Sequence, residues 1–449
     1  MIARENRRTL ALAAPIVAGH VGQMLMGWAD TVMVGHVGVV PLAACAFANT
    51  LLMVPLVFGF GVLSAVSVRA SLAFGRGDRP GTRRALVAGL VVGGGLGGLL
   101  ALGFHAFLPL LGIFGQPREV VEACSTYLLL CAWSAVPLYV SSSAKSFAES
   151  LGRPWVPFWL LLASVFLNVF LNWVLIYGNL GAPAMGLEGA GLATLLARIA
   201  GAIAVCLYPF VSRQLKSWAR GLPDGLPGEL TAVLRLGLPV GSTHLAEVSG
   251  FAAGSIMMGW IGVEALAAHQ IALTCAATTF MIPLGLSQAV SMRIGHARGS
   301  GGRTRPIALG GLLLAGGIMA VCAAVFLLFG QPIAGIFSSV ESVARLAGQL
   351  LVMAGVFQIF DGLQVMGSGA LRGFEDVKVP MLVGVAAYWL FGLPVSYAAA
   401  FPGGFGAPGV WVGFCVGLAF CAAALGARLA FRLRAEDNRD SRADAGVRE

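Results

Sequence analysis

The sequence contains very little charge. Only 11% of its 449 residues are Asp, Glu, Lys or Arg, whereas a soluble domain carries about a quarter. With 58% hydrophobic residues and a mean hydropathy of +0.85, the chain has more apolar surface than a soluble core could bury, so its solvent must be lipid. The net charge of +9 therefore does not indicate a nucleic-acid partner, because the basic residues are spread over short loops between membrane spans.

The chain also lacks the motifs of several classes of site. Its eight cysteines show no CxxC or other metal-ligand spacing and fall mostly in apolar runs, so they are typical of small core residues. No GxxxxGK[ST] sequence is present, which argues against ATP hydrolysis by this chain. The absence of HExxH and GxSxG argues against an intramembrane enzyme. We expect no cofactor.

The chain does contain a long internal repeat. Residues 12–75 align without a gap on residues 236–299, at an offset of 224, with 20 identities in 64 positions. The match includes an AVSxR sequence that ends at Arg69 in one copy and at Arg293 in the other. Such self-similarity is the signature of a duplicated fold. The sequence therefore predicts a bundle made of two related halves.

Continuous apolar runs divide the chain into membrane spans, each long enough to cross about 30 Å of hydrocarbon as a helix. They are longer than the alternating strands of a barrel. The prediction is an all-α integral membrane protein of twelve transmembrane helices, in two parallel six-helix repeats around a central cavity. We expect an N-terminal lobe at 1–212, a cytoplasmic linker at 213–229, a C-terminal lobe at 230–431 and a disordered cytoplasmic tail at 432–449. The spans lie near 10–35, 42–67, 85–112, 121–146, 156–178, 187–212, 232–259, 265–290, 306–330, 345–368, 379–400 and 408–431.

Basic residues alternate between the ends of the spans. Arg69, Lys145 and Arg293 are among those assigned to one side, and the opposite loops carry almost no positive charge. By the positive-inside rule, both termini of this inner-membrane protein are cytoplasmic. Because six is an even number, the two copies cross in the same sense and are related by an axis along the membrane normal.

Three carboxylates break the repeat inside the membrane, where ionisable groups are costly and often functional. Asp30 aligns with Gly254, and Glu247 aligns with Gln23. Asp361 aligns with a leucine at a nearly equal offset. Acids near the end of a span can also simply reach water or pair structurally, and this alternative applies most to Asp30.

Further polar residues lie near these acids in the predicted spans. Asn168 and Asn172 are four residues apart and share a helical face. Thr194 and the embedded cation Arg198 lie in the next span. Such side chains could form a site or only join neighbouring helices. The same two interpretations apply to the weaker cavity candidates Gln23, Gln288, Gln358 and Gln364.

Several motifs resemble those of the multidrug and toxic compound extrusion (MATE) transporters. They are MGWADTVMVGHVG around Asp30, N-x3-N-W-x4-YG from Asn168, EVSGF at Glu247 and FQIFDGLQVMGSGALRGFEDVKVPM around Asp361. The resemblance covers essentially the whole chain except the tail. It implies export of amphiphilic, usually cationic compounds coupled to protons or sodium. It also places Asp30, Asn168, Asn172 and Thr194 on the family's N-lobe ion and proton site, and Glu247 and Asp361 on the C-lobe acids of its sodium-linked bacterial branch.

The resulting prediction is a monomeric antiporter that exchanges drugs for Na⁺ or H⁺. Some proton-coupled members of the family carry an aspartate where this chain has Asn172, so the coupling ion stays open. Asp30 carries one negative charge among the neutral oxygens of Asn168, Asn172 and Thr194. Such a site favours Na⁺, because hard cations prefer oxygen ligands. A second possible Na⁺ site is at Glu247 and Asp361. The alternative is a flippase for a lipid-linked oligosaccharide, whose anionic substrate would require several cations in the cavity.

Overall fold

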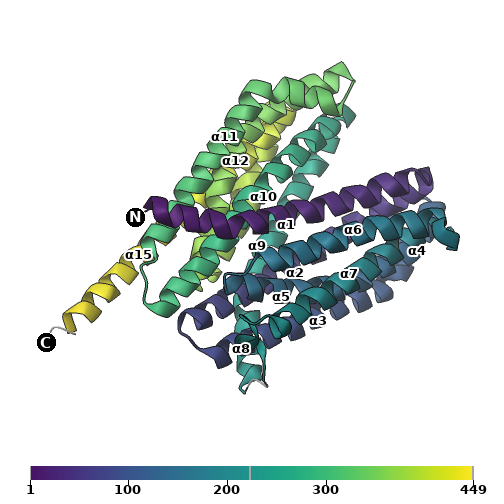
Figure 1. Cartoon of the computed structure of the whole chain (residues 1–449). Coiled ribbons are helices and arrows are strands. Elements are labelled where there is room, and N and C mark those ends of the chain that lie inside the picture. Colours follow the sequence, from purple (N-terminus) through teal and green to yellow (C-terminus); the bar gives the residue numbers. More distant parts are fainter. Residues whose placement is uncertain (1, 222–223, 447–449) are drawn as a thin grey trace. The chain divides into compact units, whose positions relative to one another are not determined.

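The computed structural model describes residues 2–221 and 224–446, with side chains described as far as residue 436. Every regular element within these ranges is helical (Figure 1). In chain order the elements are α1 (Ile2–Gly35), α2 (Val39–Gly75), α3 (Arg79–Phe107), η1 (Leu108–Phe114), α4 (Arg118–Trp133), α5 (Ala135–Ser150), α6 (Trp155–Tyr177), η2 (Asn179–Gly181), α7 (Gly186–Val211), α8 (Lys216–Ala219), α9 (Leu226–Ile261), α10 (Val263–Ser300), α11 (Arg305–Phe337), α12 (Glu341–Gly373), α13 (Lys378–Val385), η3 (Ala386–Gly392), α14 (Leu393–Ala400) and α15 (Ala407–Gly446).

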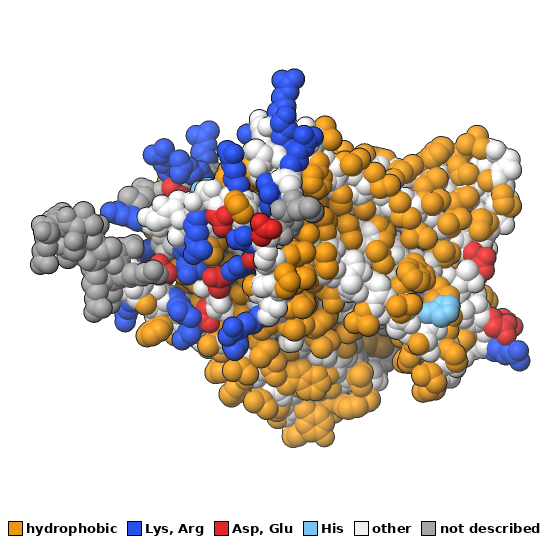
Figure 2. Space-filling view, turned by 90° about the horizontal axis from the view of Figure 1, so that it is seen from below, with side chains coloured by type: hydrophobic (Ala, Val, Ile, Leu, Met, Phe, Trp, Pro, Cys, Tyr) orange, Lys and Arg blue, Asp and Glu red, His pale blue; other side chains and the backbone are white. Residues whose placement is uncertain are grey.

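The helices have the length and composition of membrane spans. Within the described ranges, eleven helical segments are long and apolar enough to cross a bilayer, with α3–η1, α4–α5 and α13–η3–α14 each counted as one. The 36-residue helix α9 is a further long helix, and it carries Arg235 and Glu247 along its length. Hydrophobic side chains cover broad parts of the visible surface (Figure 2). These features confirm the predicted all-α membrane fold.

Several helices continue beyond the predicted spans. The helix α2 ends at Gly75, α5 at Ser150 and α10 at Ser300. The assignment of Arg69, Lys145 and Arg293 to loops was therefore wrong. Lys145 is buried within α5, where its Nζ lies 3.7 Å from the carboxylate of Glu149. A charged partner on the next turn allows the helix to carry the cation without a break.

The chain forms two compact units whose limits cut through two helices. The N unit is Ala18–Leu245, and the C unit is Met1–Val17 together with Ala246–Glu449. Thus α1 and α9 each contribute to both units. These limits differ from the lobes expected at 1–212 and 230–431, because the two repeats exchange the first halves of their first helices. In addition, α8 and the start of α9 lie in the expected linker, and α15 is helical to Gly446 where the sequence predicts a disordered tail.

Each exchanged segment packs closely against a glycine of α2 or α10, and these two glycines are equivalent in the repeat. In the C unit, a Cβ on Gly285 of α10 would come 2.5 Å from a methyl group of Val17 in α1. In the N unit, a Cβ on Gly61 of α2 would come 2.6 Å from the Cα of Gly241 in α9. The two glycines are repeat partners at the offset of 224, as are Val17 and Gly241. Only glycine permits this approach at either position.

An ion pair repeated at the same offset fastens each exchanged segment, and we call the two pairs the latch pairs. In the N unit, Arg69 donates from Nε and Nη2 to the two carboxylate oxygens of Glu229, at 2.7 and 2.9 Å. In the C unit, Arg293 forms an ion pair with Glu5 and also donates to its backbone carbonyl at 2.8 Å. Two-point contacts of a guanidinium with a carboxylate fix geometry as well as charge.

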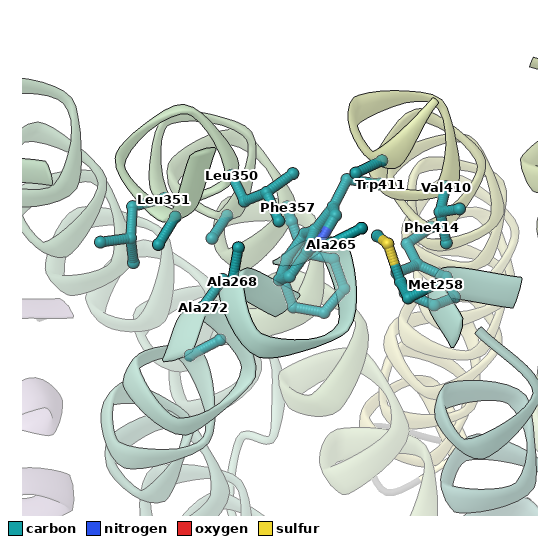
Figure 3. Close-up of a cluster of buried hydrophobic side chains, with 14 of the residues drawn as sticks. Met258, Ala265, Ala268, Ala272, Leu350, Leu351, Phe357, Val410, Trp411 and Phe414 are labelled. Carbon is teal, nitrogen blue, oxygen red and sulfur yellow. The ribbon is translucent and has the colours of Figure 1, made fainter. Parts of the chain in front are cut away.

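Each unit has its own hydrophobic core. In the C unit, small residues of α10 face large aromatic residues of α12 and α15 (Figure 3). This core includes Ala265, Ala268, Ala272, Phe357, Trp411 and Phe414. The exchanged start of α1 adds Ala13 and Ile16 to a second cluster of the C unit. A core of the N unit is formed around Val34, Ala44, Ala48, Tyr127 and Leu128.

Candidate functional site

The structure brings four of the sequence-derived candidates together in the N unit. Asp30 of α1 is buried, with 8% of its surface exposed, and it meets Asn168 and Asn172 of α6 and Thr194 of α7. Asn172 Nδ2 donates to Asp30 Oδ1 at 2.5 Å, and Thr194 Oγ1 donates to Asp30 Oδ2 at 3.3 Å. A buried carboxylate is stable only where its oxygens are hydrogen-bonded. We call this group the Asp30 pocket.

The hydrogen bonds of the Asp30 pocket leave one acceptor free. Asn172 Nδ2 also donates to Asn168 Oδ1 at 3.3 Å, and Asn168 Nδ2 donates to Thr194 Oγ1 at 3.3 Å. The remaining oxygen, Asn172 Oδ1, is buried and has no hydrogen-bond partner among the described residues. An unpaired buried acceptor is costly unless a donor or a cation occupies the adjacent space. The pocket therefore has the oxygens to take up a small cation or a proton.

Arg198 lies near the Asp30 pocket but donates its hydrogen bond to a residue outside the pocket. Its Nη1 donates to Ser134 Oγ at 2.7 Å, and its charge interacts with Asp30 from a distance. The carboxylate is thus in the field of a cation, but it accepts its hydrogen bonds from the neutral groups of Asn172 and Thr194. Asp30 is therefore a buried carboxylate held by neutral donors.

Cys45 and Tyr127 border the Asp30 pocket, and Asn49 contacts Cys45; these three residues were not identified from the sequence. Cys45 of α2 lies close enough to Asp30 for an electrostatic interaction. Its Sγ contacts the Tyr127 hydroxyl at 3.4 Å, and Asn49 Nδ2 donates to it at 3.5 Å. Asn49 is a polar residue in an apolar run, which was an available signal. Cys45 and Tyr127 resemble ordinary core residues in the sequence, so no signal identified them.

The C unit holds the other two acids as neighbours. Glu247 of α9 and Asp361 of α12 interact through their charges, and the buried Tyr388 of η3 interacts with both. Asp361 is 5% exposed, and its Oδ1 has no hydrogen-bond partner among the described residues. Two carboxylates beside each other disfavour double ionisation unless a cation or a proton sits between them. We call this group the paired-acid site.

Glutamines of α12 extend the polar stripe on which Asp361 lies. Gln358 is buried and accepts a hydrogen bond from Thr279 Oγ1 at 2.8 Å, while the buried Oε1 of Gln364 has no partner among the described residues. The other two glutamine candidates fit less well. Gln288 is only partly buried, and Gln23 is exposed on α1.

The position in the C unit that corresponds to Asp30 is filled. A Cβ on Gly254 would lie 2.2 Å from the ring of Phe414. Beside it, Trp411 Nε1 donates to His269 Nδ1 at 3.2 Å, and His269 Nε2 contacts Ser255 Oγ at 3.2 Å. Because an indole N–H can only donate, the hydrogen of this imidazole is on Nε2 and the ring is neutral. The duplicated backbone therefore holds an acid in one copy and an aromatic plug in the other.

An apolar hollow lies in the C unit and begins, on α9, six residues after Glu247. Its volume is about 420 Å³, and its walls come from α9 and α14. Ala253 of this lining is three residues after Gly250, against which Tyr388 packs. Three of its lining residues, Ile256, Trp260 and Tyr397, are more than half exposed, so the hollow opens to the surface of the unit. The lining residues are Ala253, Ile256, Met257, Trp260, Leu393 and Tyr397.

Neither acid site has the ligands of a transition metal. Within the described residues, no group of three or more His, Cys, Asp or Glu side chains is placed to hold a metal ion. The eight cysteines are unpaired thiols. The available groups are carboxylate, amide and hydroxyl oxygens, which suit hard monovalent or divalent cations and protons.

Comparison with known proteins gives concordant matches over nearly the whole chain. The family model MatE matches residues 15–174 and 239–398. The "Probable multidrug resistance protein NorM" of Rhizobium meliloti (strain 1021) is 37% identical over 443 residues, which is 95% of this chain and 93% of that protein. The protein of the same name from Pseudomonas putida is 34% identical over 94% of this chain and 93% of its own length. Among solved structures, the Vibrio cholerae MATE transporter VcmN in its bent form has a TM-score of 0.87 at 22% identity, covering 97% of this chain and 98% of that one.

Proposed function

Because the chain belongs to the MatE family, we propose that it exports amphiphilic cationic drugs across the inner membrane in exchange for an inward flow of Na⁺. The chain is a multi-pass membrane transporter and not an enzyme. The relatives from Rhizobium meliloti and Pseudomonas putida are both named as probable multidrug resistance proteins. The multidrug substrate class, the coupling ion and the role of each acid are our inferences for this chain.

The observation that carries the proposal is the pair of buried acid sites. Asp30 is held by neutral donors, and Glu247 and Asp361 interact with each other in the C unit. Buried carboxylates attract a cation when they are charged, and they lose that attraction once Na⁺ or a proton is bound. A ligand shifts a conformational equilibrium only through its different affinities for the two states. Competition for these acids therefore links ion entry to drug release.

Na⁺ is preferred to H⁺ because both sites offer neutral oxygens beside the charge. Asn172 Oδ1 in the Asp30 pocket and Gln364 Oε1 near the paired-acid site are buried acceptors without a partner among the described residues. A proton on the carboxylate would satisfy one acceptor, whereas a hard cation can satisfy several at once. Protons compete for the same carboxylates, so Na⁺-driven export should weaken at low pH.

The flippase alternative is not favoured by the charges. The acids of the two sites are Asp30, Glu247 and Asp361, and Arg198 is a cation whose charge acts on Asp30. A pyrophosphate-linked substrate needs cations at its binding site. The three acids instead suit a cationic drug.

The test is efflux of a cationic dye from proteoliposomes that contain the purified full chain. An inward Na⁺ gradient is imposed with the pH equal on both sides, and a pH gradient is imposed separately without Na⁺. We expect the Na⁺ gradient to drive efflux and Asp30→Asn to abolish it. Glu341→Gln is the matched control, because the Glu341 side chain is 86% exposed. Efflux that follows only the pH gradient would contradict Na⁺ coupling, and no efflux under either gradient would contradict drug export.

We propose further that the protein is monomeric and that both termini are cytoplasmic, as the basic loops indicate. Reporter fusions after Gly38, Gly77 and Gln214 should report outside, inside and inside. Opposite locations for the last two would contradict parallel repeats. Cross-linking in native membranes should yield no dimer.

A further inference from the structure

The eleventh span is interrupted by a π-helical segment. Between the α-helices α13 and α14, residues Ala386–Gly392 form η3, in which hydrogen bonds reach one residue further than in an α-helix. Pro394 follows directly and has no backbone N–H to donate to the preceding turn. The corresponding span of the other repeat, α6 (Trp155–Tyr177), is an uninterrupted α-helix. The duplicated fold therefore does not require the interruption, and π segments occur often at functional sites.

The π segment places Tyr388 against the paired-acid site. Tyr388 is 3% exposed, and its ring packs edge-on against Phe251 at a centroid distance of 5.8 Å. It lies over Gly250, where an added Cβ would come 3.2 Å from the Cβ of Tyr388. Its hydroxyl interacts electrostatically with both Glu247 and Asp361. Ring packing fixes the position of this hydroxyl beside the two carboxylates.

Three oxygens near the two carboxylates have unused hydrogen-bonding capacity. Asp361 Oδ1 and Gln364 Oε1 are buried acceptors without a hydrogen-bond partner among the described residues. The buried Tyr388 hydroxyl is within hydrogen-bonding reach of Glu247, and its oxygen keeps its capacity to accept. A buried acceptor is costly when neither a donor nor a cation satisfies it. Their proximity to two interacting acids indicates that a bound species normally satisfies them. A cation can contact several oxygens at once, whereas a single proton cannot.

We propose that Tyr388 is a neutral oxygen ligand of the paired-acid site, and that η3 exists to place its hydroxyl between Glu247 and Asp361. This inference rests on the proposed Na⁺-coupled function. A neutral ligand beside two carboxylates lowers the net negative charge for a given number of oxygens. It therefore favours a monovalent over a divalent cation, which requires more negative charge from its ligands.

The experiment measures Na⁺ binding to the purified full chain by isothermal titration calorimetry. Tyr388→Phe removes the hydroxyl and keeps the ring that packs on Phe251. We expect the Kd for Na⁺ to rise about tenfold, with little change in melting temperature. Tyr208→Phe is the matched control, because Tyr208 lies on α7 and packs against a core cluster of the N unit. Its Kd should equal that of the unmodified protein.

A second variant tests the role of the π segment independently of the hydroxyl. Pro394→Ala restores a backbone donor and allows the α-helical register to extend, which would rotate Tyr388 by about 100°. We expect the same loss of Na⁺ affinity although the hydroxyl is still present. Tyr388→Phe therefore tests whether the hydroxyl is needed, and Pro394→Ala tests whether its position is needed.

The possible outcomes distinguish this inference from the proposed function. If Glu247→Gln abolishes Na⁺ binding but both Tyr388→Phe and Pro394→Ala leave it unchanged, Tyr388 is not a ligand and the sodium site stands. If the unmodified protein binds no Na⁺ while its dye efflux follows a pH gradient, both the sodium site and the ligand role are overturned. A rise in Kd in both variants supports the inference.

Discussion

At one helix position, the first repeat has an acid and the second repeat has a glycine that is covered by an aromatic ring. In the N unit, Asp30 is bonded by Asn172 and Thr194. In the C unit, the ring of Phe414 occupies the space where a side chain at the corresponding Gly254 would lie. The C-unit acid on this helix, Glu247, lies seven residues earlier in the sequence. A duplicated backbone therefore does not imply duplicated chemistry, because the acids on the two equivalent helices lie about two helical turns apart.

The strongest test of this difference removes the charge from each site in turn. Asp361→Asn should reduce Na⁺-driven dye efflux about 100-fold, because one neutral group replaces half of an acid pair and leaves Glu247 to hold the ion alone. The volume is nearly unchanged, so the protein should fold. Efflux from proteoliposomes at matched protein content measures the effect. Retention of normal efflux would place all coupling in the Asp30 pocket.

A second test asks whether the aromatic plug is required for packing. Gly254→Ala places a methyl group 2.2 Å from the Phe414 ring, and overpacking of this kind costs about 1–3 kcal/mol. On the same helix, Gly259 has nothing within 4 Å of its added Cβ, so Gly259→Ala is the control. Thermal unfolding of the detergent-purified protein should show a lower melting temperature only for Gly254→Ala. Equal melting temperatures for the two variants would mean that the plug is loosely packed.

A third test compares the two latch pairs. Glu229→Gln and Glu5→Gln each remove one carboxylate from a partly buried arginine, and each should cost about 1–2 kcal/mol. The double charge reversal Arg69→Glu with Glu229→Arg should recover part of the loss. Melting temperatures of the single and double variants report the coupling. Additive losses in the double variant would show that the ion pair contributes nothing of its own.

The smallest effect is expected at a turn that the repeats build differently. The turn after α5 has Gly152 at φ +75°, and the turn after α12 has Glu375 at φ +60°. Gly152→Ala should cost about 1 kcal/mol, since a Cβ is disfavoured there. Glu375→Gly should change the free energy of unfolding by less than about 0.5 kcal/mol. Glycine adopts the positive φ without strain, and this gain offsets the loss of the ion pair between Glu375 and Arg298. A large loss at Glu375 would instead give that ion pair a structural role.

Hydropathy and the repeat were sufficient to predict the all-helical membrane fold, because both depend on composition and period. The alignment also showed where symmetry is broken, at Asp30, Glu247 and Asp361. Asn168, Asn172 and Thr194 were predicted from their place in the spans and from the resemblance to the MATE family. The exchange of Glu5 and Glu229 between units could not be predicted, since residue spacing along a chain does not reveal which neighbour a helix packs against. Tyr388 was missed for a similar reason, because a π segment changes the helical face on which a residue lies.

The shared helices also have a consequence for the origin of the chain. Each repeat places the beginning of its first helix in the unit built by the other repeat, at Val17 and at Leu245. A single six-helix ancestor with this packing would have exchanged that segment with a second copy of itself, as a domain-swapped dimer does. Gene fusion would turn an exchange between two subunits into one within a single polypeptide. Fragments separated near residue 222 should therefore assemble only when both are present.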